Sequence, residues 1–394
     1  MRIFDLKHFA MPAVFVGVLI FAVFCGDFMS YELKSGFYTL SLIIKDCLIF
    51  SLPFLIFSLI YNSASKFGKG TLKFIILIVP LICCSNFINT MLSYLFGSLF
   101  INFGIIGNSI VKMNREIAEL IPMFQLNLPK LISNDIALLS GFLFGFASSF
   151  LKNECSTKVS ALFSRFQSYF FRILTPIMPL FILGTTLKLQ HDGMLSSICS
   201  DYLPILLAFI VSAYGIVLLQ LSLLSSFNFR EFMRYIKNIA PAVIAGFGSM
   251  SSSAALPLSI KAAEDNSRDK DNAAIIIPTT VNIHLVGDCF FIPMTALAIM
   301  ASLGIEAPSF STYLLFAFYF VLAKFAVAAV PGGGILVMIP ILQNYLNFNA
   351  DMLGLITAIY ILFDSFVTAC NVAGNGAMAV IFDRIATKSL STKS

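Results

Sequence analysis

Long apolar runs separated by short polar stretches form the dominant pattern of this chain. Each run is close to the roughly 20 apolar residues that an α-helix needs to cross a bilayer. The runs cover residues 11–29, 37–63, 72–96, 136–151, 169–187 and 202–224. Residues 104–135 are too polar for one clean span and contain Pro122 and Pro129. The pattern predicts an all-α polytopic membrane protein.

The last third of the chain, from about 238 to 383, breaks this pattern. Residues 246–257 combine glycines with a serine run, and residues 330–334 read Val-Pro-Gly-Gly-Gly. Each is followed by a long apolar segment that carries polar side chains. In a bilayer, irregular backbone is tolerated only where it is buried in protein or lines a cavity. Interrupted segments at matching positions point to the binding site of a secondary transporter.

Charged residues flank segment 238–260 on both sides, with Lys237 before it and Lys261 after it. A helical hairpin that enters the membrane and returns to the same side satisfies both flanks. Residues 309–347 are interpreted as a second hairpin, which enters from the opposite side. A hairpin followed by a helix, occurring twice, constitutes an inverted repeat. A pair of ordinary kinked helices is the alternative interpretation.

Composition and charge agree with this class. The chain has 394 residues, of which 58% are hydrophobic and 11% charged, with a mean hydropathy of +0.92. Soluble domains carry about 25% charged residues. The net charge of +5 comes from Lys and Arg that fall in alternate loops, so nucleic acid is not an expected partner and the lipid bilayer is. The positive-inside rule then places both termini in the cytoplasm, with the protein in the plasma (inner) membrane.

Several other classes are disfavoured. The first apolar run follows Lys7 without a small-residue cleavage site, so it is interpreted as a retained helix rather than a signal peptide. Six of the eight cysteines lie in apolar segments, where they act as small hydrophobic residues. The sequence has no Ser-His-Asp order, metal-ligand spacing or phosphate-binding loop, so an enzyme is not expected. No cofactor is expected apart from a coupling ion.

Polar side chains in the last apolar segment follow helical spacing. Asp364, Thr368, Asn371 and Asn375 are separated by four, three and four residues, which places them on one stripe of a helix. A carboxylate at this depth is costly and needs a partner such as a substrate ammonium, a cation or an internal lysine. The alternative is a buried network with a structural role only.

A second polar group lies in the segment between the two predicted hairpins. Pro278 and Gly287 allow the helix to unwind there, and the freed carbonyl groups could coordinate a cation. His284 and Asp288 stand four residues apart and could form a pair, whose protonation would couple transport to protons. A hydrogen-bonded buried histidine without such a role is the equally weighted alternative.

The serine run in 246–257, the glycine stretch 330–334 and Lys324 are the remaining candidates for ligand-binding groups. The serine run offers hydroxyls and backbone amides to an anionic group, and the glycines of 331–334 let backbone approach a ligand closely. Either stretch could also be a plain turn. Lys324 lies within the apolar arm of the second hairpin. Its ammonium could reach the membrane interface, or it could occupy a cation position.

In order along the whole chain, these features resemble the dicarboxylate/amino acid:cation symporter family, which includes the glutamate transporters. The resemblance is strongest over 240–386. It lies in the serine-rich stretch 251–257, in the glycine tip 330–334, and in the final helix with Asp364, Val367, Thr368, Asn371 and Asn375. The resemblance implies eight transmembrane helices plus two re-entrant hairpins, a homotrimer, and an elevator-type movement of a transport domain past a scaffold.

The resemblance also implies a division of the chain. Residues 1–69 and 98–195 are expected to form scaffold helices 1–2 and 4–5. The transport domain is expected to comprise helix 3 (70–97) and residues 196–394, with helix 6, hairpin 1 at about 238–264, helix 7 at 274–302, hairpin 2 at 309–347 and helix 8 at 350–386.

The same resemblance implies the site residues. By position, Asp364 would hold the amino group of an amino acid substrate, and Asn371, Ser252 and the backbone near Val330 its carboxylate. The substrate-binding set is Ser251, Ser252, Ser253, Asp288, Val330, Pro331, Gly332, Gly334, Asp364, Val367, Thr368 and Asn371. The cation set is Ser85, Asn86, Asn282, His284, Asn371 and Asn375, with Lys324 as a tethered cation.

Departures from the family pattern bear on substrate and coupling. Val367 replaces the arginine that reads an acidic side chain, so acidic substrates lose their charge partner. A small neutral amino acid is therefore the expected substrate, with a dicarboxylate or acidic amino acid as the alternative.

The expected sodium sites of the family are also altered. Val286 and Asn375 replace carboxylate ligands of two sodium sites, and Lys324 lies near a third sodium position. Three coupling hypotheses follow: a single sodium ion held by backbone carbonyls, a proton site formed by His284 and Asp288, or Lys324 as a tethered cation in an uncoupled carrier or exchanger. An anion-conducting channel is the runner-up function.

Overall fold

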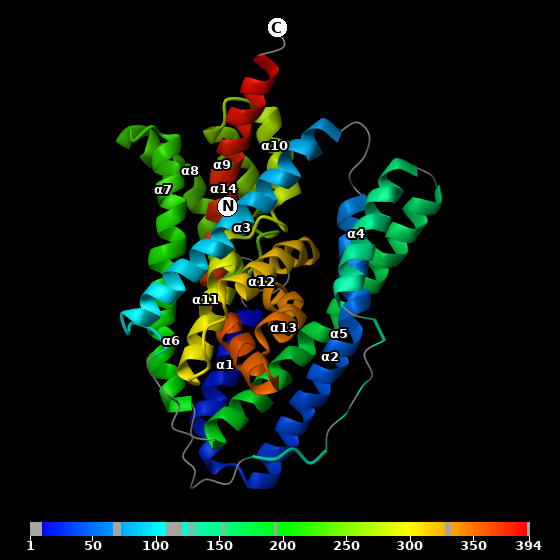
Figure 1. The fold of residues 1–394 in the computed structure, drawn as a ribbon, viewed down its shortest axis with the longest axis vertical. Helices are drawn as coiled ribbons and strands as arrows, with labels where there is room; N and C mark the ends of the chain where they lie inside the picture. Colours follow the sequence, from blue (N-terminus) through cyan, green and yellow to red (C-terminus); the bar gives the residue numbers. More distant parts are fainter. Residues whose placement is uncertain are drawn as a thin grey trace.

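All regular secondary structure in the described part of the chain is helical in the computed structural model, and this part contains no strand (Figure 1). The structure describes residues 10–65, 72–107, 120–124, 126, 128, 131–132, 134–151, 154–192, 195–327 and 332–391.

Most helices are long, and several are joined by short 3-10 or π segments. The elements are α1 (Ala10–Cys25), η2 (Gly26–Phe28), α2 (Tyr31–Ser65), α3 (Leu72–Asn102), α4 (Asn134–Leu151), α5 (Glu154–His191), α6 (Leu195–Phe209), the π-helix η4 (Ile210–Tyr214), α7 (Gly215–Leu224), α8 (Phe229–Ser249), α9 (Leu256–Asn266), α10 (Lys270–Thr280), α11 (Val286–Ser302), α12 (Phe310–Ala323), η5 (Lys324–Ala326), α13 (Gly333–Leu346) and α14 (Ala350–Ser391).

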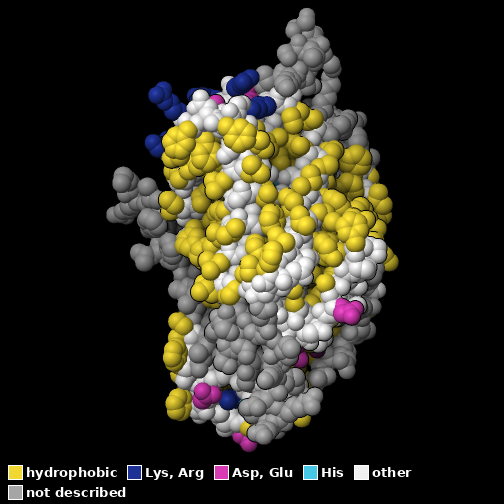
Figure 2. All heavy atoms as spheres, turned by 60° about the vertical axis from the view of Figure 1, so that its left-hand side comes forward, with side chains coloured by type: hydrophobic (Ala, Val, Ile, Leu, Met, Phe, Trp, Pro, Cys, Tyr) yellow, Lys and Arg dark blue, Asp and Glu magenta, His cyan; other side chains and the backbone are white. Residues whose placement is uncertain are grey.

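Several helices are apolar enough to lie in a membrane. Among the described residues, Leu77–Asn102, Tyr202–Leu224 and Ala350–Ile385 are long and apolar enough to cross a bilayer, and five shorter helices are also apolar. Figure 2 shows a broad band of hydrophobic side chains, with Lys and Arg gathered at the upper end of the molecule. Such a band flanked by charge is typical of an integral membrane protein. The predicted all-α membrane class is confirmed at this level.

Helices α2, α4 and α5 pack along one another on the right-hand side of Figure 1. Their close approach depends on small residues. At Gly145 of α4 a Cβ atom would lie 2.6 Å from the carbonyl oxygen of Tyr61 in α2, closer than any side chain can sit. Small residues at helix interfaces allow backbones in a membrane to approach in this way.

The prediction for α5 was wrong at its start. The helix begins at Glu154 rather than at 169, so most of the polar stretch between the predicted segments 136–151 and 169–187 is helical. The ring of Phe163 packs against Phe57 and Tyr61 of α2, and Ser164 accepts a hydrogen bond from Asn62 of the same helix. Lys158 and Arg165 lie on the exposed side of α5, so their charge did not mark a loop.

Helices α8 and α9 form a helix–turn–helix pair. The side-chain amide of Asn238, in the first half of α8, donates to Asn266 Oδ1 at the end of α9 over 2.7 Å. Asn266 Nδ2 donates in turn to the Tyr235 carbonyl oxygen over 3.3 Å. The beginning of α8 and the end of α9 therefore lie together, and the serine turn 250–255 lies at the far end of the pair.

Helices α12 and α13 form a second pair, which packs against α3. The rings of Tyr319 and Tyr345 stack with centroids 4.7 Å apart. The hydroxyl of Tyr313 donates to the Thr90 carbonyl oxygen over 2.8 Å. In Figure 1, α8 and α9 occupy the upper part of the molecule and α12 and α13 its lower centre.

The two segments that follow these pairs differ in continuity. The expected helix 274–302 is divided into α10 and α11, because residues 281–285 are not helical. The break falls between Pro278 and Gly287, where unwinding was predicted. By contrast, α14 runs without a break for 42 residues, a length of about 63 Å.

Candidate functional site

A small polar cavity lies where the tips of both hairpins, the break between α10 and α11, and α14 meet. Its volume is about 30 Å³, close to the share of liquid volume occupied by one water molecule. It is lined by Met250, Ser251, Ser252, Val281, Asn282, Leu285, Asp288, Val327, Gly334, Tyr360, Asp364, Thr368 and Asn371. The cavity thus collects polar side chains that are far apart in the sequence.

Asp288, in the first turn of α11, lies at the centre of a buried charge network. Its carboxylate forms a salt bridge with Lys324, with Nζ 3.0 Å from Oδ2. Its other oxygen accepts from the Tyr360 hydroxyl at 2.8 Å and from Asn371 Nδ2 at 3.4 Å. The side chains of Lys324 and Asp288 are 0% and 1% exposed. Breaking such a pair by removing one partner leaves an uncompensated buried charge, which is strongly destabilising.

A second carboxylate, Asp364 in α14, joins the glycine tip to the cavity. Asp364 Oδ2 accepts from the backbone amide of Gly332 over 2.9 Å, and Oδ1 accepts from the Thr368 hydroxyl over 3.0 Å. These are hydrogen bonds and not ion pairs, so the carboxylate has no cationic side chain bound to it among the described residues.

The amides of Asn371 and Asn375 bind the interrupted backbone to α14. Asn371 Oδ1 accepts from the backbone amides of Gly287 at 2.8 Å and Asp288 at 3.3 Å, which are free because they begin α11. Asn375 Nδ2 donates to the carbonyl oxygens of His284 at 3.2 Å and Asn371 at 3.0 Å. The stripe predicted on the last helix is therefore assembled around the start of α11.

His284 binds α3 rather than Asp288. Its Nε2 atom and the Ser85 hydroxyl hydrogen-bond each other over 2.9 Å, and Asn86 bonds the neighbouring backbone at Ile283 and Leu285. The predicted His284–Asp288 pair is wrong. Residues four apart meet only on a continuous helix, and residues 281–285 are not helical; Asp288 pairs with Lys324 instead.

The remaining predicted residues divide into those at the cavity and those away from it. Ser253 is exposed, and the buried side chain of Val367 does not line the cavity. Val330 and Pro331 lie outside the described residues. Lining the cavity are Ser251, Ser252, Asn282, Asp288, Gly334, Asp364, Thr368 and Asn371, while Gly332 reaches it through its bond to Asp364.

Tyr360 is a site residue that the sequence reasoning missed. It lies four residues before Asp364, so it extends the polar stripe of α14 by one turn toward the N-terminus. That spacing was a usable signal, but a tyrosine in an apolar helix reads as core. A Cβ atom at Gly334 would overlap the Tyr360 hydroxyl and lie 2.7 Å from Asp288 Oδ2. The glycine therefore allows the second tip to approach this network closely.

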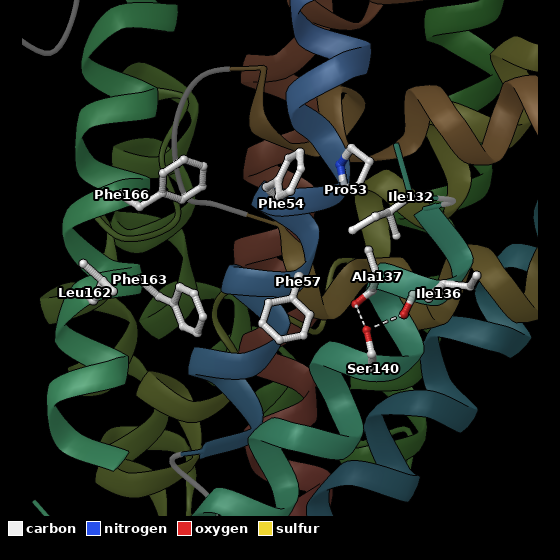
Figure 3. Close-up of a pocket in the computed structure, with 10 residues that line it drawn as sticks. All are labelled: Pro53, Phe54, Phe57, Ile132, Ile136, Ala137, Ser140, Leu162, Phe163 and Phe166. Atoms are coloured by element: carbon white, nitrogen blue, oxygen red, sulfur yellow. Dashed lines mark hydrogen bonds between the residues drawn. The ribbon is translucent and has the colours of Figure 1, made fainter. Parts of the chain in front are cut away.

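A larger cavity, of about 550 Å³, lies between α2, α4 and α5 (Figure 3). It is lined by Pro53, Phe54, Phe57, Ile132, Ile136, Ala137, Ser140, Leu162, Phe163 and Phe166. Its hydroxyl, on Ser140, already donates to the carbonyl oxygens of Ile136 and Ala137. No ionisable side chain lines it, so it has no partner for a charged ligand. Of these two cavities, only the small one at the hairpin tips is lined by ionisable side chains.

Comparison with known proteins agrees with this geometry. A profile of the sodium:dicarboxylate symporter family matches residues 11–385. The serine/threonine transporter SstT of Streptococcus agalactiae is 21% identical over 357 residues, which cover 86% of each chain. The human neutral amino acid transporter B(0) is 29% identical over 143 residues, 36% of this chain and 26% of its own length. A putative sodium-dependent excitatory amino acid transporter of Caenorhabditis elegans, glt-4, is 24% identical over 184 residues, 46% of this chain and 36% of its own.

The family match covers nearly the whole described chain, and it confirms both the resemblance seen in the sequence and the expected class of secondary transporters. The chain belongs to the sodium:dicarboxylate symporter family.

Proposed function

We propose that this protein is a carrier that moves a small neutral amino acid across the membrane, with the cavity between the two hairpin tips as its substrate site. The observation that carries the proposal is the charge of the cavity lining. It contains two carboxylates and no arginine or lysine. One carboxylate, Asp288, is already paired with Lys324, so Asp364 remains for the ammonium group of an amino acid.

The polar groups at the cavity match the two ends of an amino acid. Asp364 and the side-chain oxygen of Asn282, which has no hydrogen-bond partner among the described residues, are acceptors for an ammonium group. Ser252 in the first tip offers a hydroxyl to the substrate carboxylate, and Thr368 lies beside Asp364. A cavity of about 30 Å³ must expand to hold an amino acid.

The side chain of the substrate is expected to be neutral. An arginine fork is the usual partner of a second carboxylate, and the position where the family resemblance expects it holds Val367, which is buried outside the lining. A dicarboxylate or glutamate would bury a negative charge without a partner, which is costly. Two of the relatives described above are named for serine/threonine and for neutral amino acids.

The mechanism we propose is an elevator movement. The closely packed α2, α4 and α5 would form the static scaffold together with α1, and the two hairpin pairs, α3, α6–α7, α10–α11 and α14 the moving part. Each hairpin would be re-entrant, from opposite faces of the membrane, with both termini in the cytoplasm. The shared ends of α8 and α9 and the glycine contact between α2 and α4 support this division. The assembly would be a homotrimer.

A thermal-shift screen of the purified protein tests the proposal. Ligand binding raises the melting temperature in proportion to the logarithm of ligand concentration over its dissociation constant. Serine, threonine, alanine, glutamate and succinate would be compared. We expect stabilisation by neutral amino acids, followed by saturable, stereoselective counterflow in proteoliposomes. A response confined to glutamate or succinate would favour an acidic substrate, and unitary anion currents without counterflow a channel.

A further inference from the structure

We infer that the ammonium of Lys324 is a built-in cation of this site, so that amino acid binding does not require sodium. This inference rests on the proposed function for its substrate but not for its cation chemistry. The family description pairs its members with sodium. The buried groups around Asp288 do not fit a sodium ion, for three reasons.

The first reason is that the positive charge is already present. Lys324 lies in η5, between the two arms of the second hairpin, and is 0% exposed. Its Nζ atom lies 3.0 Å from Asp288 Oδ2 and 4.4 Å from the centroid of the Phe320 ring. An ammonium held between a carboxylate and an aromatic face is fully enclosed. The lysine therefore does not extend to the membrane interface.

The second reason is that the carboxylate oxygens of Asp288 are occupied. They accept from an ammonium, the Tyr360 hydroxyl and the Asn371 amide, which come from η5 and α14. A sodium ion beside the Lys324 ammonium would place two positive charges next to each other. They would repel strongly, because charges interact more strongly in a medium of low dielectric constant than in water. One buried carboxylate is matched by one buried cation.

The third reason concerns the neighbouring oxygens. Hard cations such as sodium prefer oxygen ligands. Here the carbonyl oxygens of His284 and Asn371 accept from the Asn375 amide nitrogen. The side-chain oxygen of Asn371 accepts two backbone amides at the start of α11. The amide nitrogen of Asn375 thus occupies the space between two carbonyl groups that could otherwise share a cation, while its Oδ1 atom, like that of Asn282, has no hydrogen-bond partner among the described residues and lies outside the contacts of Asp288.

The consequence is a site in which each carboxylate has a different cation. Lys324 permanently neutralises Asp288, and the ammonium of the substrate neutralises Asp364 when it binds. Sodium is not needed to complete this balance, so substrate affinity should be the same whether sodium or an inert organic cation is present.

The decisive measurement uses the native protein. Its affinity for the amino acid found in the screen is determined in sodium chloride and in choline chloride at equal ionic strength. We expect the two dissociation constants to agree within about twofold, whereas a site that binds sodium would lose about tenfold or more. A tenfold or larger loss of affinity in choline overturns the inference.

Variants then locate the effect. Lys324→Met removes the charge while keeping an unbranched apolar side chain, so Asp288 must recruit a free cation. We expect its substrate affinity to rise about tenfold or more when choline is replaced by sodium. The double variant Lys324→Met/Asp288→Asn removes both charges and should lose this sodium response. Lys188→Met is the matched control, because Lys188 forms a buried pair with Asp192 away from the cavity, and it should bind substrate as the native chain does.

The inference also has a readout that needs no substrate. The ligand-free native protein should melt at the same temperature in sodium and choline, and Lys324→Met should be stabilised by sodium. If no amino acid stabilises the protein, the proposed function fails while this measurement still tests the cation. A stable Lys324→Met that binds substrate equally in choline and sodium would show that no cation is needed beside Asp288, and would overturn the inference.

Discussion

Two buried lysine–aspartate pairs occur in the described chain, and their differences are instructive. Lys188 and Asp192 lie four residues apart at the end of α5, with 2.6 Å between charged atoms. Lys324 and Asp288 come from the second hairpin and from α11, with 3.0 Å between charged atoms. Both pairs are buried. The first is built by the local geometry of one helix end, and the second only by the meeting of two separate elements.

The surroundings of the two pairs explain their separate roles. Asp192 also accepts from the backbone amide of Leu120 at 3.2 Å, and Lys188 lies 5.5 Å from the Tyr38 ring centroid. That pair therefore attaches a connecting segment and α2 to the end of α5. Asp288 instead faces the cavity between the tips. A buried ion pair can hold elements of the fold together or form part of a binding site, and its position in the fold decides which.

The largest effect is expected for Asp288→Asn, which leaves the Lys324 ammonium enclosed without a carboxylate. Removing one partner of a buried pair costs about 3–5 kcal/mol. We expect a large fall in the melting temperature of the detergent-solubilised protein. The double variant Asp288→Asn/Lys324→Met should recover most of this loss, and a variant as stable as the native chain would show that the pair does not bear a full charge.

Asp364→Asn is expected to affect binding more than folding, because this carboxylate has hydrogen bonds but no cationic partner. A charge-assisted hydrogen bond to the substrate ammonium is worth about 1.5–3 kcal/mol, so amino acid affinity should fall about tenfold to hundredfold. The thermal-shift titration measures this. Asp351→Asn, in the first turn of α14 and outside the cavity lining, is the control and should leave affinity unchanged. An unaltered titration for Asp364→Asn would remove this residue from the site.

Asp192→Asn breaks the Lys188–Asp192 pair and should lower the free energy of unfolding by less than Asp288→Asn does. The asparagine oxygen still accepts from Leu120. The Lys188 and Asp192 side chains are 5% and 6% exposed, against 0% and 1% for the other pair, so the unpaired ammonium is less completely enclosed and a loss of about 1–3 kcal/mol is expected. Thermal unfolding should show the loss, while substrate affinity stays unchanged. Reduced affinity would mean that the two pairs are coupled through the fold.

Tyr360→Phe should give the smallest change, because it removes one of several hydrogen bonds to Asp288. A net cost of about 0.5–1.5 kcal/mol is expected, since the salt bridge to Lys324 remains. The melting temperature reports the stability, and the sodium-to-choline affinity ratio should stay near one. A new dependence on sodium would show that Tyr360, and not Lys324 alone, excludes the free cation.

Much of the architecture was predictable from periodicity and composition. The polar stripe of α14, the two helix–turn–helix pairs, and the break before Gly287 follow from residue spacing and helix-breaking residues. The start of α5 could not be predicted in this way, because charged residues on the exposed side of a helix resemble a loop in sequence.

The site was predictable in its members but not in their partners. The i,i+4 spacing predicts a pair of His284 and Asp288, and this rule fails where the backbone unwinds. The sequence does not indicate Tyr360, because the carboxylate that its hydroxyl contacts lies 72 residues away in the chain. The sequence alone does not decide whether Lys324 reaches the membrane interface or occupies a cation position.

By itself, the sequence determined that this chain is a helical membrane transporter with its polar groups collected in the last third, because a bilayer restricts buried polar groups so severely. Only the tertiary structure decided which carboxylate is neutralised from within and which is left for a ligand. Charge pairing is a matter of distance and burial in three dimensions, and neither quantity is encoded in the spacing of Lys324 and Asp288 along the chain.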